Sequence, residues 1–146
     1  MRSGRSAGWR AWVPVVVWLG VIWTVNSMPR QTFPESVRKS PRADPQAHVF
    51  LYLPLGALLM RTLLKPDQGR AHTARSFALA VLLGAALAGL DEWHKFLIPT
   101  RKGEVADWLR DVVGVSLGAV GWAGLVWFGV RRVQRDLGAQ PSGDGG

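Results

Sequence analysis

The residues of this sequence that could carry chemistry are polar and ionisable side chains placed beside long apolar runs. They are Asn26, Ser27, Asp44, His48, Asp91, Glu92, His94, Lys95, Arg101, Asp107 and Asp111. Moving an ionisable group from water toward hydrocarbon is costly, so a set that borders apolar runs is by default a hypothesis for a functional site. Carboxylates and histidine can act as acids or bases, and arginine can hold a phosphate or carboxylate through two parallel hydrogen bonds.

We predict that most of these residues form one ligand-binding site. Its predicted members are Asp44, His48, Asp91, Glu92, His94, Arg101, Asp107 and Asp111. If the site is catalytic, Asp91 or Asp107 is the candidate base, and His48 or Arg101 is the candidate for stabilising negative charge. The sequence leaves open whether the protein is an enzyme.

Asp44 and His48 stand at the start of one apolar run. Asp44 followed by Pro45 is typical of a helix N-cap with a proline in the first turn, and His48 lies about one turn farther on. Capping of the helix alone would explain Asp44. A cap uses one carboxylate oxygen, so the other oxygen of Asp44 could still contact a ligand. A histidine that opens an apolar helix needs a hydrogen-bond partner, which favours a site role for His48.

A second group follows a later apolar run. On a helix, Asp91 shares a face with His94 and Lys95, whereas Glu92 projects about 100° away. A simple Asp91–Lys95 ion pair is the alternative to a ligand site. The segment 99–103 is predicted to be a turn, and its Arg101 could equally be a plain anchor at a membrane interface.

Small residues recur at helical spacing beside these carboxylates and predict close packing of two helices. These positions are Ala80, Gly84 and Ala88 in one run and Gly114, Gly118 and Gly121 in the next. Packing of the two thin faces would bring Asp91 near Asp107 and Asp111. Lys95 and Arg101 would then compensate the gathered negative charge.

Several classes of function are not supported. The chain has no cysteine, which excludes disulfides, thiolate metal sites and cysteine nucleophiles. It lacks zincin, P-loop and serine-hydrolase motifs, and its histidines lack HxxxH spacing, so no cofactor or metal is predicted, with a carboxylate–histidine metal site as a minor alternative. The net charge of +8 comes from short clusters between apolar runs, which argues against nucleic-acid binding.

The elements that must position the polar residues are four apolar runs. They cover residues 11–29, 45–60, 76–90 and 112–130, the third extended as a helix through Phe96 to reach membrane length. The first run follows basic residues like a signal peptide, but no cleavage motif follows it, so we expect it to be retained. The predicted fold is an all-α integral membrane bundle of four transmembrane helices. Residues 1–10 form a basic N-terminus, 11–130 the membrane domain, and 131–146 a basic and then disordered tail.

The distribution of basic residues predicts the orientation of this bundle. The N-terminus, 61–75 and 131–135 carry ten Lys and Arg residues, against eight on the other side. The positive-inside rule therefore favours both termini in the cytoplasm, with residues 30–44 and 91–110 facing outward. Tryptophans near both predicted faces are typical of interfacial anchors.

Three stretches resemble the VanZ-like family of small bacterial membrane proteins, named for a member associated with teicoplanin resistance. They are Asn26-Ser27-Met28-Pro29, the Asp44/His48 start of the second run with HVFLYLPLGALL, and DEWHKFLIPTRKGEVADWLRDVVGVSLGA at 91–119. In the last stretch, Asp91, Glu92, His94, Arg101, Asp107 and Gly114 match the family pattern. Lys95 replaces a Gln, Thr100 a Gly, and Asp111 an Asn.

The resemblance implies a membrane bundle of the bacterial cytoplasmic membrane, spanning roughly residues 10–130. We expect a cell-envelope protein that binds a polar headgroup, a lipid-linked wall precursor or a glycopeptide at the outward Asp/His/Arg cluster and modulates teicoplanin-type susceptibility. The alternatives are a membrane enzyme that modifies a lipid headgroup and a structural subunit of an envelope complex. Membrane lipids are expected partners, an envelope ligand or protein is a further one, and the oligomeric state is left open.

Overall fold

The computed structural model describes residues 6–28, 35, 43–65, 69–98 and 103–138. Within these ranges the regular secondary structure is entirely helical. The helices are α1 (Ser6–Arg10), α2 (Val13–Ser27), α4 (Ala43–Leu63), α5 (Gly69–Lys95) and α6 (Val105–Gly138). Each of the four predicted apolar runs lies in one long helix, α2, α4, α5 or α6.

The helix ends differ from the ends of the apolar runs. The second run begins two residues inside α4, and α5 starts at Gly69, well before residue 76. Helix α6 starts at Val105 and continues to Gly138, so the first half of the predicted tail is helical. Hydropathy ends where charged residues begin, whereas helical hydrogen bonding continues through Lys, Arg and Glu, which are good helix formers.

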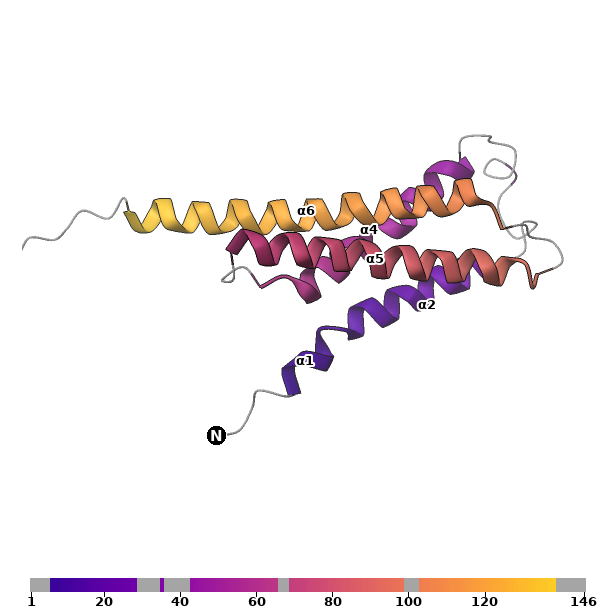
Figure 1. Cartoon of the computed structure of the whole chain (residues 1–146), viewed down its shortest axis with the longest axis horizontal. Coiled ribbons are helices and arrows are strands. Elements are labelled where there is room, and N and C mark those ends of the chain that lie inside the picture. Colours follow the sequence, from indigo (N-terminus) through magenta and orange to yellow (C-terminus); the bar gives the residue numbers. More distant parts are fainter. Residues whose placement is uncertain (1–5, 29–34, 36–42, 66–68, 99–102, 139–146) are drawn as a thin grey trace, which may run out of the picture.

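Helices α4, α5 and α6 form the body of the bundle. Helix α6 packs most extensively against α4 and next against α5, and Figure 1 shows α5 and α6 side by side along much of their length. Helix α2 lies against α5 and α4 near one end, and α1 leads away from the body (Figure 1). The core draws on all four long helices and consists of Val15, Ile22, Tyr52, Leu55, Leu59, Met60, Ala80, Ala88, Val115 and Ala119.

Glycines let the backbones of α4 and α6 approach closely. A Cβ atom at Gly118 would overlap the carbonyl of Leu53, and one at Gly56 would overlap the carbonyl of Val115. The predicted partner of the α6 glycines was the stripe of small residues on α5, but Gly114 and Gly118 pack on α4 instead. The residue of α6 that packs closely on Gly84 of α5 is Val115, through its side chain. A Cβ atom added at Gly121 would have nothing within 4 Å, so Gly121 makes no such close contact.

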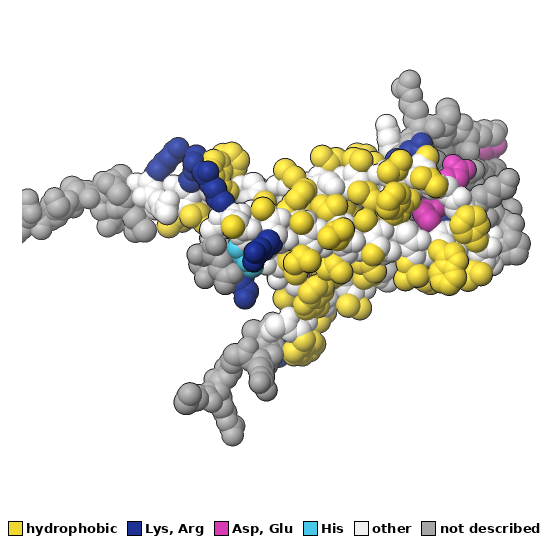
Figure 2. Space-filling model, viewed as in Figure 1, with side chains coloured by type: hydrophobic (Ala, Val, Ile, Leu, Met, Phe, Trp, Pro, Cys, Tyr) yellow, Lys and Arg dark blue, Asp and Glu magenta, His cyan; other side chains and the backbone are white. Residues whose placement is uncertain are grey.

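Three helices are long and apolar enough to cross a membrane. They cover Gly8–Ser27, Gly69–Lys95 and Val105–Arg135. Large apolar side chains on their surfaces are exposed, and Figure 2 shows an apolar band between one end that carries basic side chains and another that carries acidic ones. Helix α4 is not among the helices that meet this criterion in the described part of the chain. The fourth span and the orientation of the termini therefore stay predictions.

Two hydrogen bonds from side chains attach α2 to the rest of the bundle. The indole N–H of Trp18 donates to the carbonyl of Leu51 at 2.9 Å, and the amide of Asn26 donates to Asp91 Oδ2 at 2.5 Å. Pro54 has no N–H to donate to the carbonyl of Phe50, four residues before it, and Leu51 is the next residue along α4. Trp18 therefore bonds α4 beside the position where that helix lacks a hydrogen bond.

We expect Trp18→Phe to lower the free energy of unfolding by about 1 kcal/mol, because most of the ring volume is kept while one hydrogen bond between α2 and α4 is lost. Thermal unfolding of the purified chain in detergent, followed by circular dichroism, measures this loss. Trp12→Phe is the matched control, since the Trp12 side chain is exposed. Equal melting temperatures for the two variants would show that the Trp18 hydrogen bond contributes nothing.

Candidate functional site

Polar side chains are buried together at one end of the bundle, where α2 and α5 end and α4 and α6 begin. We call this group the acidic cluster; its members are Asn26, His48, Tyr52, Asp91, Glu92, Lys95, Asp107 and Asp111. Asp111 is fully buried, and Lys95 and Asp91 are 2% and 3% exposed. Burial of so many ionisable groups is tolerated only when they are paired with one another or with a ligand.

Lys95 ties together the carboxylates at the end of α5. Its Nζ donates to Glu92 Oε1 at 2.5 Å and lies 3.9 Å from Asp91 Oδ2. The other oxygen of Glu92 accepts the backbone N–H of Glu104 at 3.0 Å, just before α6 begins. The Asp91–Lys95 ion pair, which the sequence offered as the alternative to a ligand site, is present at 3.9 Å, and the pair between Glu92 and Lys95 is closer.

His48 links α4 to the first turns of α6. Its Nδ1 lies 2.8 Å from Asp111 Oδ1, and its Nε2 lies 3.3 Å from Asp107 Oδ2. Asp107 also pairs with Arg110 on the same helix. Each ring nitrogen of His48 therefore faces a carboxylate, and the ring can donate to both when it is protonated. A histidine oriented by a carboxylate in this way is a common arrangement for proton transfer and for binding metals.

Two carboxylate oxygens in the cluster lack a hydrogen-bond donor among the described residues. They are Asp91 Oδ1 and Asp111 Oδ2, and both are shielded from solvent. The three most buried carboxylates, Asp91, Glu92 and Asp111, are accompanied by a single buried amine, that of Lys95. The cluster is therefore rich in negative charge and has spare acceptors, a combination that suits a cationic ligand or a hydrogen-bond donor.

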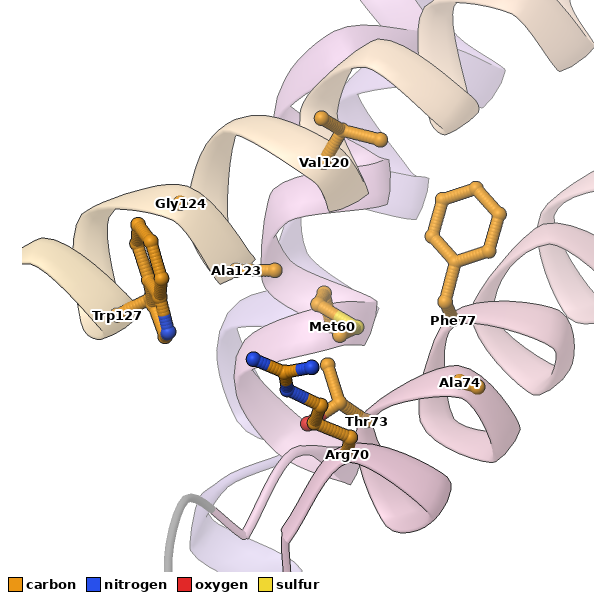
Figure 3. A pocket seen from close by; sticks show the side chains of 9 residues that line it. All are labelled: Met60, Arg70, Thr73, Ala74, Phe77, Val120, Ala123, Gly124 and Trp127. Carbon is orange, nitrogen blue, oxygen red and sulfur yellow. The ribbon is translucent and has the colours of Figure 1, made fainter.

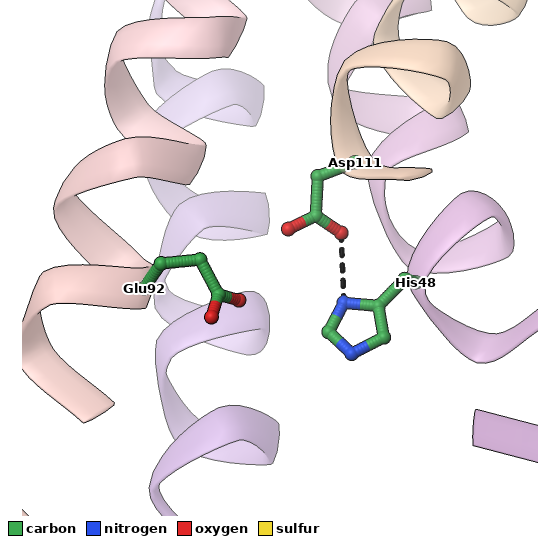
Figure 4. A group of neighbouring side chains, drawn as sticks. All are labelled: His48, Glu92 and Asp111. Atoms are coloured by element: carbon green, nitrogen blue, oxygen red, sulfur yellow. Dashed lines mark hydrogen bonds and ion pairs between the residues drawn. The ribbon is translucent and has the colours of Figure 1, made fainter. Parts of the chain in front are cut away.

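Donor atoms of His48, Glu92 and Asp111 lie within 4.8 Å of one another, as a shared metal ion would require (Figure 4). They come from three different helices, α4, α5 and α6. The sequence did not predict a metal, because no regular ligand spacing exists between positions so far apart in the chain.

The remaining predicted site residues are placed as follows. His94 leaves the cluster and contacts the ring of Trp23, with 4.3 Å between the ring centroids. Asp44 lies in the first turn of α4, but its side chain is outside what the structure describes, and Arg101 lies outside the described residues altogether. The structure brings together His48, Asp91, Glu92, Asp107 and Asp111.

Sequence analysis did not place three members of the cluster in the predicted site. Asn26 and Lys95 had been noted as polar residues beside apolar runs, and both contact Asp91. Tyr52 had been missed; it lies one turn beyond His48 on α4, is 1% exposed and is close to Asp91. It is the only tyrosine in the chain, and its spacing of four from His48 was the available signal.

A small cavity adjoins the acidic cluster. It has a volume of about 230 Å³ and lies between the end of α5 and the start of α6. Its walls include the rings of Trp93, Phe96 and Trp108 together with Glu92 and Glu104. Glu92 is thus shared between the cavity and the buried cluster.

A larger cavity lies toward the opposite end, among α4, α5 and α6. Its volume is about 560 Å³, and apolar side chains such as Met60, Phe77 and Trp127 line it, with Arg70 beside them (Figure 3). The guanidinium of Arg131 stacks over Trp127 at 3.5 Å from the ring centroid. This cavity contains no carboxylate and is chemically distinct from the first.

Comparison with known proteins gives one match. The family model described as VanZ-LLP1: VanZ/LLP1 matches residues 11–128, which includes the whole acidic cluster. No curated protein and no solved structure matches the chain.

Proposed function

The chain belongs to the VanZ/LLP1 family, and from this premise we propose that it is a multi-pass protein of the bacterial cytoplasmic membrane that binds a polar envelope ligand at the acidic cluster. The proposed consequence of binding is altered susceptibility to teicoplanin-type glycopeptides. The single observation that carries the proposal is Glu92, which belongs to both the buried cluster and the adjoining cavity.

We propose four spans with both termini in the cytoplasm. The end of α4, the start of α5 and the end of α6 lie at one end of the bundle and carry Arg61, Arg70, Arg75, Arg131, Arg132 and Arg135. Basic residues are retained on the cytoplasmic side, so this end faces inward. The acidic cluster, at the other end, then faces the cell wall, where glycopeptides and wall precursors are found.

The chemistry of the cavity favours a ligand that carries an amine or several hydroxyl groups. Glu92 and Glu104 can accept hydrogen bonds from such groups, and an aromatic wall packs against sugar rings or holds a cation above a ring face. Phospholipids with an amine headgroup, amino-sugar wall precursors and glycopeptides all offer these features. A purely anionic ligand fits poorly, because the surrounding carboxylates repel it.

Ordinary bilayer lipids are the second kind of partner that we propose. The larger cavity is apolar and lies beside Arg70 and Arg131, so it suits an acyl chain with an anionic headgroup at the basic end. Binding of a bilayer lipid in the larger cavity requires no specific envelope ligand. The larger cavity therefore serves as the comparison site in the binding test.

The test measures thermal stabilisation of the purified full chain by a glycopeptide, a lipid-linked wall precursor and phosphatidylethanolamine, each added separately. At a concentration of about 100 times Kd, a ligand that binds only the folded chain contributes about 2.7 kcal/mol, or roughly 5 °C or more in Tm. We expect one of these ligands to stabilise wild type, with the gain lost in Trp93→Leu and Glu92→Gln.

Trp127→Leu is the matched control, because Trp127 lines the other cavity. A ligand whose effect is lost in Trp127→Leu and kept in Trp93→Leu binds the larger cavity, which would contradict the proposed site. Absence of stabilisation by all three ligands would instead favour a structural subunit whose cluster only pairs its own charges.

An enzyme acting on a lipid headgroup is the second candidate function, favoured by the His48–Asp111 contact of 2.8 Å. Asp111 could hold the imidazole while His48 moves a proton, with Asp91 or Asp107 as further acid or base. In that case expression of wild type changes the lipid or precursor profile of the cell, and His48→Gln at equal abundance does not. An identical profile with and without the wild-type chain would count against it.

A further inference from the structure

We infer that His48, Glu92 and Asp111 form a binding site for one divalent metal cation. Their donor atoms, one imidazole nitrogen and two carboxylate oxygens, lie within 4.8 Å of one another. The three side chains converge from α4, α5 and α6 on the same space (Figure 4). This site does not depend on the proposed envelope ligand, because all of its donors belong to the chain itself.

An independent observation supports the site. Asp111 is fully buried, yet its Oδ2 has no hydrogen-bond donor among the described residues. One oxygen of Asp111 bonds His48, and in Figure 4 the other points toward Glu92. A fully buried carboxylate oxygen without a donor is costly, and a cation between Asp111 and Glu92 would satisfy it.

The charge balance at this end of the bundle points the same way. Asp91, Glu92 and Asp111 are all buried, and Lys95 carries the only buried amine in the described part of the chain. Asp107 is already paired with Arg110. A divalent cation would neutralise the two negative charges of these three carboxylates that the amine of Lys95 leaves unbalanced.

The geometry needs only a small adjustment. His48 Nδ1 and Asp111 Oδ1 are 2.8 Å apart, close to the roughly 3 Å between neighbouring ligands of a cation with bonds of about 2.1 Å. The longest separation in the group, at most 4.8 Å, must shorten to about 4.2 Å or less, the reach of two such bonds that lie opposite each other.

Neighbouring residues support the donors as the surroundings of metal sites usually do. When one nitrogen of His48 binds the cation, the other can donate to Asp107, now 3.3 Å away. The backbone N–H of Glu104 and the amine of Lys95 hold the two oxygens of Glu92. Because Glu92 also borders the small cavity, a coordination position left open by the chain would face that cavity.

The donor set selects the class of metal. One imidazole and two carboxylates suit first-row divalent cations such as Mn²⁺ and Zn²⁺, whereas an imidazole ligand disfavours Mg²⁺ and Ca²⁺. Three protein ligands leave further positions for water or for an oxygen of a ligand.

The experiment titrates the chelator-treated full chain in detergent with Mn²⁺ and follows free Mn²⁺ by electron paramagnetic resonance. We expect about one bound Mn²⁺ per chain, displaced by Zn²⁺, and an affinity at least tenfold lower in His48→Gln and Asp111→Asn. The matched controls are His72→Gln and His94→Gln, whose side chains are not donors in the site; both should bind Mn²⁺ as wild type does.

A measurement on wild type alone keeps the inference testable if a variant does not fold. Pulsed electron paramagnetic resonance of the bound Mn²⁺ should show modulation from one imidazole nitrogen. Failure of wild type to bind Mn²⁺ or Zn²⁺, bound Mn²⁺ without a nitrogen signal, or equal losses in the control variants would each overturn the metal site.

Discussion

Lys95→Met is expected to lower the free energy of unfolding by about 3 to 5 kcal/mol, the range measured when one partner of a buried ion pair is removed. Lys95 is 2% exposed, and its amine is 2.5 Å from Glu92 and 3.9 Å from Asp91. Methionine keeps most of the side-chain volume but leaves both carboxylates without their only buried amine. Unfolding in detergent with increasing denaturant, followed by circular dichroism, measures the loss.

Two further variants separate the lost charge from the lost packing. Lys65→Met replaces an exposed lysine and should change stability by less than about 0.5 kcal/mol. Glu92→Gln in the Lys95→Met background removes the carboxylate that is left unpaired, so it should recover part of the stability. If Lys95→Met behaves like Lys65→Met, the carboxylates of the cluster do not depend on this amine.

The helices could be predicted from the sequence because each apolar run is free of charged residues and has 15 residues or more. Their ends could not, since charged segments such as 69–75 and 131–138 continue a helix whose hydrogen bonds do not depend on hydropathy. Helix α4 differs from the other three long helices because it is not among the candidate spans. Its apolar residues can serve packing against neighbouring helices instead of contact with lipid.

The sequence predicted which residues form the candidate site better than it predicted the contacts between them. Polar residues beside apolar runs identified Asp91, Glu92, Asp107 and His48, since their cost of burial is visible from residue type alone. Helical geometry put Lys95 on the face of Asp91, but positions i+3 and i+4 are both within reach of a long side chain, and Glu92 at i+3 is the closer partner.

Pairing between helices was harder to predict than position within a helix. Small residues mark a face that can approach another backbone, but they do not say which helix approaches. The glycines of α6 pack on α4, and Gly84 of α5 receives the side chain of Val115. This arrangement places α4 near the centre of the bundle, which is why His48 and Tyr52 reach the carboxylates of α5 and α6.

Gly118→Ala is expected to destabilise the bundle by about 3 kcal/mol or more, at or above the upper end of the usual cost of overpacking. The added Cβ atom would overlap the carbonyl of Leu53 and crowd the backbone N–H of Ala57. Backbone atoms inside a helix cannot move aside as a flexible side chain can, so α4 and α6 must separate. This contact joins the two helices that pack most extensively, so the variant should lower both the melting temperature and the yield of folded protein.

Gly121→Ala is the matched control on the same helix, because nothing lies within 4 Å of a Cβ atom added there. Its stability should equal that of wild type or exceed it by up to about 1 kcal/mol, since alanine favours the helix more than glycine does. The comparison uses the same detergent and the same circular dichroism melt for both variants. Similar losses at the two positions would mean that helix α6 does not pack on α4 through Gly118, and the position of His48 beside Asp111 would then lose its structural basis.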